Sequence, residues 1–201
     1  MSISRLRGRR AAAADREIDA GSYALPATVT RAPLLKGGSD QRFRALVADL
    51  FTISMRMEMV REHLGRRMGI SGPQYSIVVA VAHLQGRAGI SVGSLAQALH
   101  VSSAFIATEG GKLARCGLLL KRTNPLDRRV VLLSVAAAGR LAVDRVSAEI
   151  RTVNDLFFGS LDATSFASLS VAAGALVESS AKAVRYTTLA KGSPQSLRNT
   201  G

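Results

Sequence analysis

Basic side chains cluster around a predicted turn in the middle of the chain. The stretch LLLKRTNPLDRRVVLLSV, residues 118–135, contains Lys121 and Arg122 before the turn and Arg128 and Arg129 directly after it. Lysine and arginine bind phosphate oxygens through charge-assisted hydrogen bonds. The cluster therefore suits contact with a polyanion, although a solvated loop would have the same composition.

Small polar side chains lie just upstream of this cluster. Ser102, Ser103 and Thr108 carry hydroxyl groups, and Lys112 follows one helical turn later. Small polar residues let a helix approach base edges and phosphates closely, and a lysine adds positive charge. These residues suit the binding of nucleic acid.

Sequence motifs for catalysis and metal binding are missing. The chain has no glycine-rich phosphate loop, no GxSxG motif and no paired-carboxylate cluster, so we expect no enzymatic activity and no cofactor. His63, His83 and His100 show no ligand spacing with Cys116, which argues against a metal site. We expect Cys116 to be a buried or half-buried packing residue rather than a redox sensor.

The overall charge also favours a polyanionic partner. The 201 residues include 27 lysines and arginines against 14 aspartates and glutamates, a formal net charge of +13. Such an excess indicates nucleic acid, an anionic membrane or an acidic protein as partner. No apolar run reaches the roughly 18–20 residues that span a bilayer, and the N-terminus lacks a signal-peptide core. We therefore expect a cytoplasmic protein with no membrane partner.

Hydrophobic periodicity predicts a mainly helical chain. Apolar residues recur every three or four positions from Gln41 to about Gly69, and again over 136–158 and 162–186, which predicts long amphipathic helices. The segment QYSIVVAVAHL predicts a short buried helix, although its β-branched residues leave a strand open.

Two shorter helices and a hairpin follow in the centre of the chain. Ser91 and Ser102 are predicted N-caps, and a helix that ends at Leu99 is separated by HVS from a second helix that stops at Gly117. This is the helix-turn-helix plan, in which the second helix lies in the DNA major groove. The hairpin over 118–135 is then a wing whose arginines reach the adjacent minor groove.

Residues 41–186 resemble the MarR family of winged helix-turn-helix transcriptional regulators. The features that carry the resemblance are the helix entry ISGPQY, Leu95–Ala96, Leu113 with Gly117–Leu118, the motif NPLDRR and then Gly139. The resemblance implies a mainly α (α+β) fold, with a two-stranded β wing and long N- and C-terminal dimerisation helices. The expected parts are a basic, flexible N-terminal arm (1–39), a helical dimerisation region (40–70 and 140–186), a DNA-binding domain (71–139) and a flexible tail (187–201).

The resemblance also implies a function. Family members bind double-stranded DNA as homodimers, often as repressors that leave a pseudo-palindromic operator when an aromatic acid or acyl-CoA-like effector binds. In the family the aspartate and second arginine of the wing brace each other, which implies Asp127 with Arg129, whereas Arg128 meets the DNA. This chain departs from the family at Ala107 and Thr108, where relatives often have Thr-Arg, so base preference does not transfer.

A second site is expected on the first long helix. Phe51, Met55 and Met59, with Tyr75 from the next helix, suit an apolar effector pocket, and Arg56 could offer a counter-charge for a carboxylate. The same methionines also suit a dimer core.

Two other function classes stay open at this point. A sequence-tolerant DNA-binding or architectural protein without effector control would also use the high net charge and the four arginines among the first ten residues. A winged domain used only for protein contacts is the third class, and the clustered basic residues argue against it.

Overall fold

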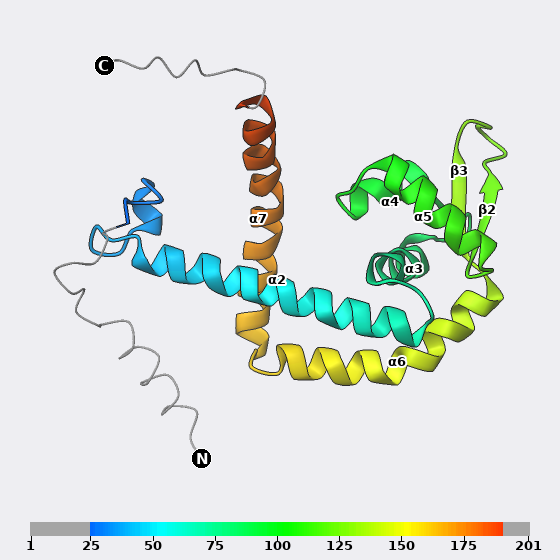
Figure 1. Ribbon diagram of the computed structural model, residues 1–201, viewed down its shortest axis with the longest axis horizontal. Helices are drawn as coiled ribbons and strands as arrows, with labels where there is room; N and C mark the ends of the chain where they lie inside the picture. Colours follow the sequence, from blue (N-terminus) through cyan, green and yellow to red (C-terminus); the bar gives the residue numbers. More distant parts are fainter. Residues whose placement is uncertain (1–24, 191–201) are drawn as a thin grey trace, which may run out of the picture. The chain divides into compact units, whose positions relative to one another are not determined.

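Helices and one small antiparallel sheet make up the fold (Figure 1). The computed structural model describes residues 25–190. In chain order its elements are η1 (Ala32–Leu34), α2 (Gln41–Arg67), α3 (Gly72–Leu84), β1 (Ile90–Ser91), α4 (Val92–Ala98), α5 (Ser103–Arg115), β2 (Leu119–Thr123), β3 (Val131–Val135), α6 (Ala137–Phe158) and α7 (Ala163–Ala190). The mainly helical class and the β wing that the sequence predicts are confirmed.

The chain divides into two compact units within α2, at Met57 and Glu58. In the first unit Asp40 is buried, and both the backbone N–H and the hydroxyl of Thr28 donate to its Oδ2 at 2.7 Å. Arg44 lies 3.1 Å from the other oxygen. The hydrogen bonds from Thr28, more than Arg44, hold the pKa of Asp40 below its ordinary value.

These contacts involve residues that the sequence places in the N-terminal arm. Residues 25–40 contain η1 and a tight turn over 36–39, so this part of the arm has defined hydrogen bonds. The arm over 1–24 and the tail over 191–201 lie outside the described residues.

The hydrophobic core lies in the second unit, where α3, α4 and α5 pack against the sheet. Its nearly inaccessible side chains are Ile77, Val78, Val81, Leu95, Ile106, Leu113, Leu119, Leu133 and Val135. Burial of one side chain of this size contributes about 1.5–3 kcal/mol. The core therefore fixes the orientation of α5 against the strands of the wing.

Serine caps begin the three helices of this domain. Ser71, Ser91 and Ser102 each accept a hydrogen bond from the backbone N–H three residues later, at 3.4, 3.0 and 3.1 Å. An N-cap of this kind satisfies a backbone donor that the helix leaves unpaired. At Ser71 the side chain of Gln74 completes a capping box, and the segment from Gly72 is α3, so the strand alternative is wrong.

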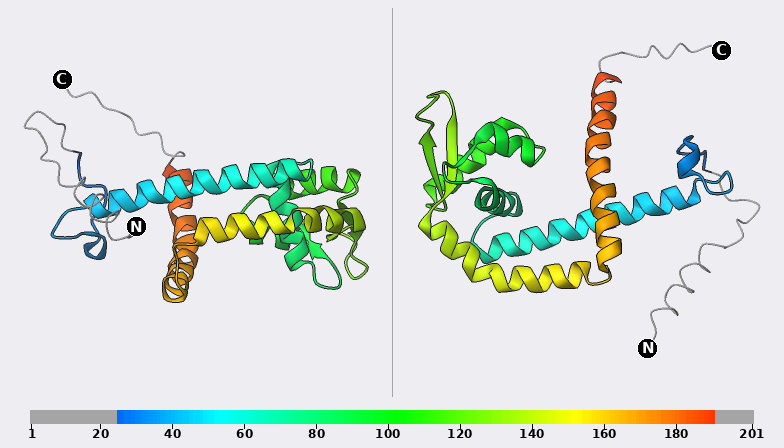
Figure 2. Two further views of the ribbon diagram at one scale, coloured as in Figure 1. Left: turned by 90° about the horizontal axis from the view of Figure 1, so that it is seen from below. Right: turned by 180° about the vertical axis from the view of Figure 1, so that it is seen from behind.

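Three strands form the sheet in the order β1-β3-β2. The wing hairpin pairs β2 with β3, with Lys121 opposite Leu133. On the other side of β3, Ile90 of β1 also pairs with Leu133. Figures 1 and 2 show the hairpin extending past the neighbouring helices, so its loop is open to a partner.

Two contacts hold α6 in the second unit. At its start, the backbone N–H of Ala136 donates to Leu118 at 3.0 Å. Further along, Glu149 lies 2.6 Å from Nε2 of His63 and accepts from Nε of Arg67 at 3.1 Å. The hydrogen bond with His63, followed by that with Arg67, lowers the pKa of Glu149. The end of α2 and the middle of α6 are thus joined.

Among residues 25–190, no single helix is both long and apolar enough to cross a membrane. Helices α6 and α7 meet the length and composition criteria only as a pair, bent by 93° at their junction.

Substitution of Gly139 by alanine should destabilise the fold. A Cβ there would lie 2.1 Å from the carbonyl oxygen of Leu118, so the chain at the α6 junction must shift. We expect Gly139→Ala to lower the free energy of unfolding by about 1–3 kcal/mol in urea denaturation followed by circular dichroism. Gly93→Ala is the control, because its Cβ would meet nothing closer than Ser91 Oγ at 4.0 Å. Equal stability of the two variants would contradict the prediction.

Candidate nucleic-acid interface

Helix α5 presents one buried and one open face. Ile106, Gly110 and Leu113 recur at helical spacing on the buried face. The exposed residues Ala104, Ala107, Thr108 and Lys112 lie away from it, and only the lysine is long. A flat surface of this kind can approach another surface closely.

Hydroxyl groups at the start and middle of α5 differ in their availability. The Ser102 oxygen already accepts the capping hydrogen bond from Phe105 N–H. Ser103 and Thr108 are exposed, and their side chains have no hydrogen-bond partner within residues 25–190. Ser103 and Thr108 are therefore free to contact a ligand, whereas Ser102 caps the helix and keeps only its O–H donor for one. A DNA contact of all three residues stays a prediction.

The ammonium group of Lys112 is held by a neighbouring carboxylate. It lies 2.7 Å from Oε1 of Glu109, whose Oε2 accepts from Gln74 Nε2 at 2.8 Å. The hydrogen bond with Lys112, and then that with Gln74, lowers the pKa of Glu109. The Lys112 side chain is 49% exposed, and an ion pair at such a position contributes only about 0–1 kcal/mol. Lys112 can therefore exchange this partner for a phosphate.

Backbone hydrogen bonds define the loop of the wing. Asn124 N–H donates to Val130 at 2.8 Å, and Val130 N–H donates to the carbonyl of Asp127 at 2.9 Å. The Asn124 side chain accepts from the N–H of Leu126 at 3.0 Å. The loop is consequently a closed turn rather than an extended linker.

Asp127 and Arg129 are joined by side-chain and backbone contacts. Oδ1 of Asp127 accepts from the backbone N–H of Arg129 at 3.0 Å and from its Nε at 3.2 Å. These hydrogen bonds, the side-chain one first, lower the pKa of Asp127. The arrangement has the geometry of the brace that the resemblance implies, and its importance for the wing stays a prediction.

The remaining basic residues of the hairpin divide into bound and free. Arg122 donates through Nη2 to the carbonyl of Ala88, which joins β2 to the loop before β1. Arg128 and Lys121 are exposed and have no hydrogen bond or ion pair with any described residue. Arg128 lies in the loop and Lys121 on the strand, so the wing offers free cations at two places.

Predicted effector residues show two kinds of environment. In the first unit Phe51 and Met55 are 68% and 69% exposed, and Arg56 is exposed as well. In the second unit Met59 is 68% exposed, whereas Tyr75 is only 8% exposed and burial raises the pKa of its phenol. A pocket role for these residues stays a prediction.

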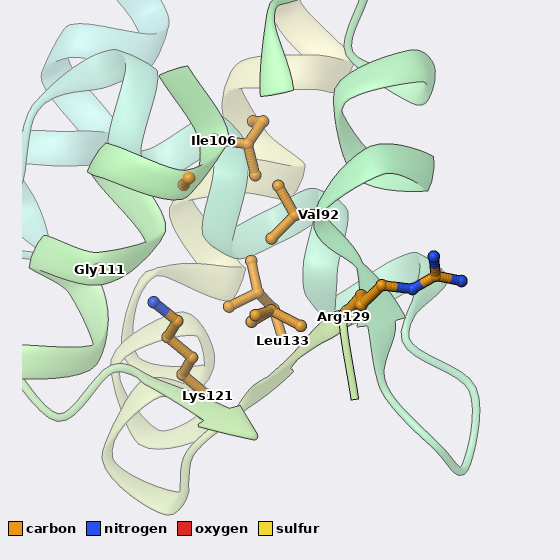
Figure 3. Close-up of a pocket in the computed structure, with 8 residues that line it drawn as sticks. Val92, Ile106, Gly111, Lys121, Arg129 and Leu133 are labelled. Carbon is orange, nitrogen blue, oxygen red and sulfur yellow. The ribbon is translucent and has the colours of Figure 1, made fainter. Parts of the chain in front are cut away.

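A cleft of about 200 Å³ lies elsewhere, between α5 and the wing (Figure 3). Its lining residues are Val92, Ile106, Ala107, Gly111, Lys121, Arg129, Val131 and Leu133. None of the predicted effector residues is among them. Sequence reasoning missed this cleft because its walls come from four elements and a loop that only the folded sheet brings together.

Cys116 is exposed at the C-terminal cap of α5, so the prediction of a buried or half-buried residue is wrong. Helix α5 itself ends at Arg115, and Gly117 follows the cap with a φ of +73°, which favours glycine. This turn directs Cys116 outward. Among the described residues, no three histidine, cysteine, aspartate or glutamate side chains gather as a metal site would require.

Comparison with known proteins identifies the fold. No family model and no curated protein sequence matches the chain. Among solved structures, one described as a MarR family transcription regulator has a TM-score of 0.58 at 20% identity. The match covers 73% of this chain and 94% of that one. The S. aureus MepR–DNA complex has a TM-score of 0.58 at 15% identity, covering 66% of this chain and 96% of that one.

A third structure, PcaV from Streptomyces coelicolor in complex with its natural ligand, has a TM-score of 0.52 at 23% identity. It covers 63% of this chain and 90% of that one. At these identities the likeness establishes the fold, which is the winged helix fold of these regulators. The resemblance seen in the sequence is thereby confirmed at the level of the fold.

The contact between Asp127 and Arg129 should hold the wing loop in order. We expect Arg129→Ala to speed hydrogen exchange of the Val130 amide. Asp127→Ala should speed it more, because the Asp127 carboxylate also accepts from the backbone N–H of Arg129, and the double variant should match Asp127→Ala alone. The matched control Arg128→Ala should leave that exchange unchanged. Additive effects of the two substitutions would contradict the brace.

The same contact should depend on pH. Because the folded pKa of Asp127 lies below its unfolded value, the contribution is complete above the unfolded pKa of about 3.9. It should be lost as the pH falls through the lowered folded pKa, which NMR of the loop amides would show.

Proposed function

We propose that this protein is a sequence-specific, DNA-binding transcriptional regulator. The observation that carries the proposal is that one hydrophobic core positions both an open face of α5 and a hairpin loop that presents Arg128, which has no partner among residues 25–190. The solved MepR structure, which has this fold, is a DNA complex. We infer a non-enzymatic role in the cytoplasm.

In this proposal α5 lies in the major groove. Ser103 and Thr108 would meet base edges, because their hydroxyl groups are exposed and unpaired, and Lys112 would meet a phosphate. Small side chains such as Ala107 and the Thr108 methyl suit contact with the thymine methyl group. No arginine occupies these two positions, so the operator should differ from those of relatives with Thr-Arg.

The wing would lie in the adjacent minor groove. Arg128 suits this role because no group in residues 25–190 competes for its guanidinium, and the narrow minor groove has a strong negative potential. Arg129 would act indirectly, since Asp127 already occupies it.

A homodimer would place two such interfaces on a pseudo-palindromic operator. In α7 large apolar side chains are exposed over the whole helix, among them Phe166, Leu169, Leu176 and Val184. In α2 the same holds for Leu46, Leu50, Ile53 and Met57. Exposed apolar side chains in such number on each helix favour burial against a partner, and a second copy of the chain carries the same helices.

The proposal also includes control by a small-molecule effector. Phe51, Met55 and Met59 are available to an aromatic acid or acyl-CoA-like ligand, with Arg56 for its carboxylate. The solved PcaV structure contains a natural ligand. An effector that favours a conformation with poor DNA affinity would make the protein a repressor released from its operator.

A sequence-tolerant DNA-binding protein without effector control is the second candidate. The net charge of +13 favours it, because phosphate contacts alone give strong and non-selective binding. The two candidates differ in the ratio between specific and random affinity.

Selection from randomised duplexes should distinguish them. We expect the wild-type protein to enrich a pseudo-palindrome that it binds at least about 10³-fold more tightly than random duplex. Ser103→Ala and Thr108→Ala should change the ranking of operator variants, because those side chains contact base edges. Enrichment of no sequence would favour the second candidate, and an unchanged ranking in both variants would exclude this face of α5.

Loss of Arg128 should weaken binding through charge. Arg128→Ala should flatten the log–log dependence of affinity on salt by about 0.9 per subunit, or about 1.8 for a dimer. Arg151→Ala, an exposed residue on α6, removes the same charge elsewhere and is the matched control. Equal slopes in the two variants would mean that Arg128 acts only through the general field of the protein.

A further inference from the structure

We propose that the cleft between α5 and the wing accommodates one phosphodiester strand of the duplex, with Lys121 as its phosphate contact. This inference rests on the proposed function and adds a contact residue, Lys121, together with a requirement for glycine at position 111.

The position of the cleft leads to this assignment. A helix in the major groove and a wing in the adjacent minor groove are separated by one sugar–phosphate strand. The protein surface between α5 and the hairpin must therefore be hollow where that strand passes. The cleft lies in this place, since Ala107 and Gly111 of α5 line one side and Lys121 and Val131 of the hairpin line the other.

The chemistry of the cleft matches a sugar–phosphate strand. Val92, Val131 and Leu133 give it an apolar lining that suits deoxyribose, and its lining residues include two cations and no acid. In Figure 3 the Lys121 side chain extends toward α5 near Gly111, whereas the guanidinium of Arg129 points away from the cleft. Lys121 is thus the cation that faces the strand.

Lys121 is also available for the contact. Its pairing opposite Leu133 places both residues on the face of the sheet that α5 covers. It has no ion pair or hydrogen bond with any residue in the described range, unlike Arg122 and Arg129, which contact Ala88 and Asp127. A phosphate would therefore displace no protein partner.

Gly110 and Gly111 are adjacent in α5, but the space around their Cα atoms differs. A Cβ at Gly110 would lie 3.1 Å from Cδ1 of Leu133, so packing of the core accounts for this glycine. A Cβ at Gly111 would meet only Nη1 of Arg115 among the described residues, at 3.8 Å, so packing among these residues does not require glycine at position 111. Glycine is unfavourable inside a helix. Close approach of an external strand explains why a side chain is absent there.

The first test is the substitution Lys121→Gln in the full-length protein. On the selected operator we expect the log–log salt dependence to flatten by about 1.8 for a dimer, as two phosphate contacts are lost. The ranking of operator variants should stay the same, because a phosphate contact carries no base information. Arg151→Gln is the control for net charge.

The second test uses a glycine pair that separates stability from binding. Gly111→Ala and Gly174→Ala both add a methyl group within a helix without a close contact, since the nearest atom is Nη1 of Arg115 at 3.8 Å for the first and none lies within 4 Å for the second. Each should therefore raise Tm by about 2–4 °C. Only Gly111→Ala should weaken operator binding, by about tenfold or more, because its methyl group enters the path of the strand. Light scattering would verify that both variants keep the wild-type mass.

The outcomes separate this inference from the proposed function. If the wild-type protein binds no duplex selectively, the proposed function fails, and the inference fails with it. If the wild type is selective but Lys121→Gln and Gly111→Ala bind as it does, the inference is overturned while the function stands. Weaker operator binding by both variants, with the ranking of operator variants unchanged for Lys121→Gln, would support the inference that a DNA strand lies in the cleft.

Discussion

Close packing of α5 on the centre of the sheet determines the geometry of the whole interface. Leu133 is fully buried in the middle strand, lies opposite both Ile90 and Lys121, and meets α5 where Gly110 has no side chain. A larger residue at Gly110 would push the helix away from β3. The separation of α5 from the wing, and with it the width of the cleft, depends on this contact.

The basic side chains of the hairpin differ in whether they contact other residues of the protein. Arg122 and Arg129 use their guanidinium groups within the protein, on Ala88 and Asp127. Lys121 and Arg128 have no partner among residues 25–190. Bound arginines restrict the hairpin before a ligand arrives, so less conformational entropy is lost on binding. In the proposed function, the two free cations supply the attraction to the DNA phosphates.

Local signals in the sequence predict much of this arrangement. Serine caps, a glycine stop at Gly117 and two β-rich runs around NPLD depend on neighbours within a few positions, and the structure contains them all. Strand β1 was missed because two residues show no periodicity, and only pairing with β3 makes them a strand. The bonds of Glu109 to Gln74 and of Arg122 to Ala88 join distant positions, so no local pattern could indicate them.

The solvent exposure of single side chains was also hard to predict from the sequence. Cys116 follows an apolar helix face, yet the turn at Gly117 leaves it exposed. The cleft likewise depends on where α5 lies over the sheet. Hydrophobic periodicity predicts which face of a helix is buried, but it does not predict this position.

In the proposed complex, α5 and the wing occupy adjacent grooves on either side of one strand. Hydroxyl-radical footprinting of the selected operator would reveal this arrangement, because the radical attacks deoxyribose through the minor groove. We expect one protected minor-groove segment in each half-site, beside the strand that the cleft covers, and loss of that segment alone in Arg128→Ala. Protection that never enters the minor groove, or that Arg128→Ala leaves intact, would contradict it.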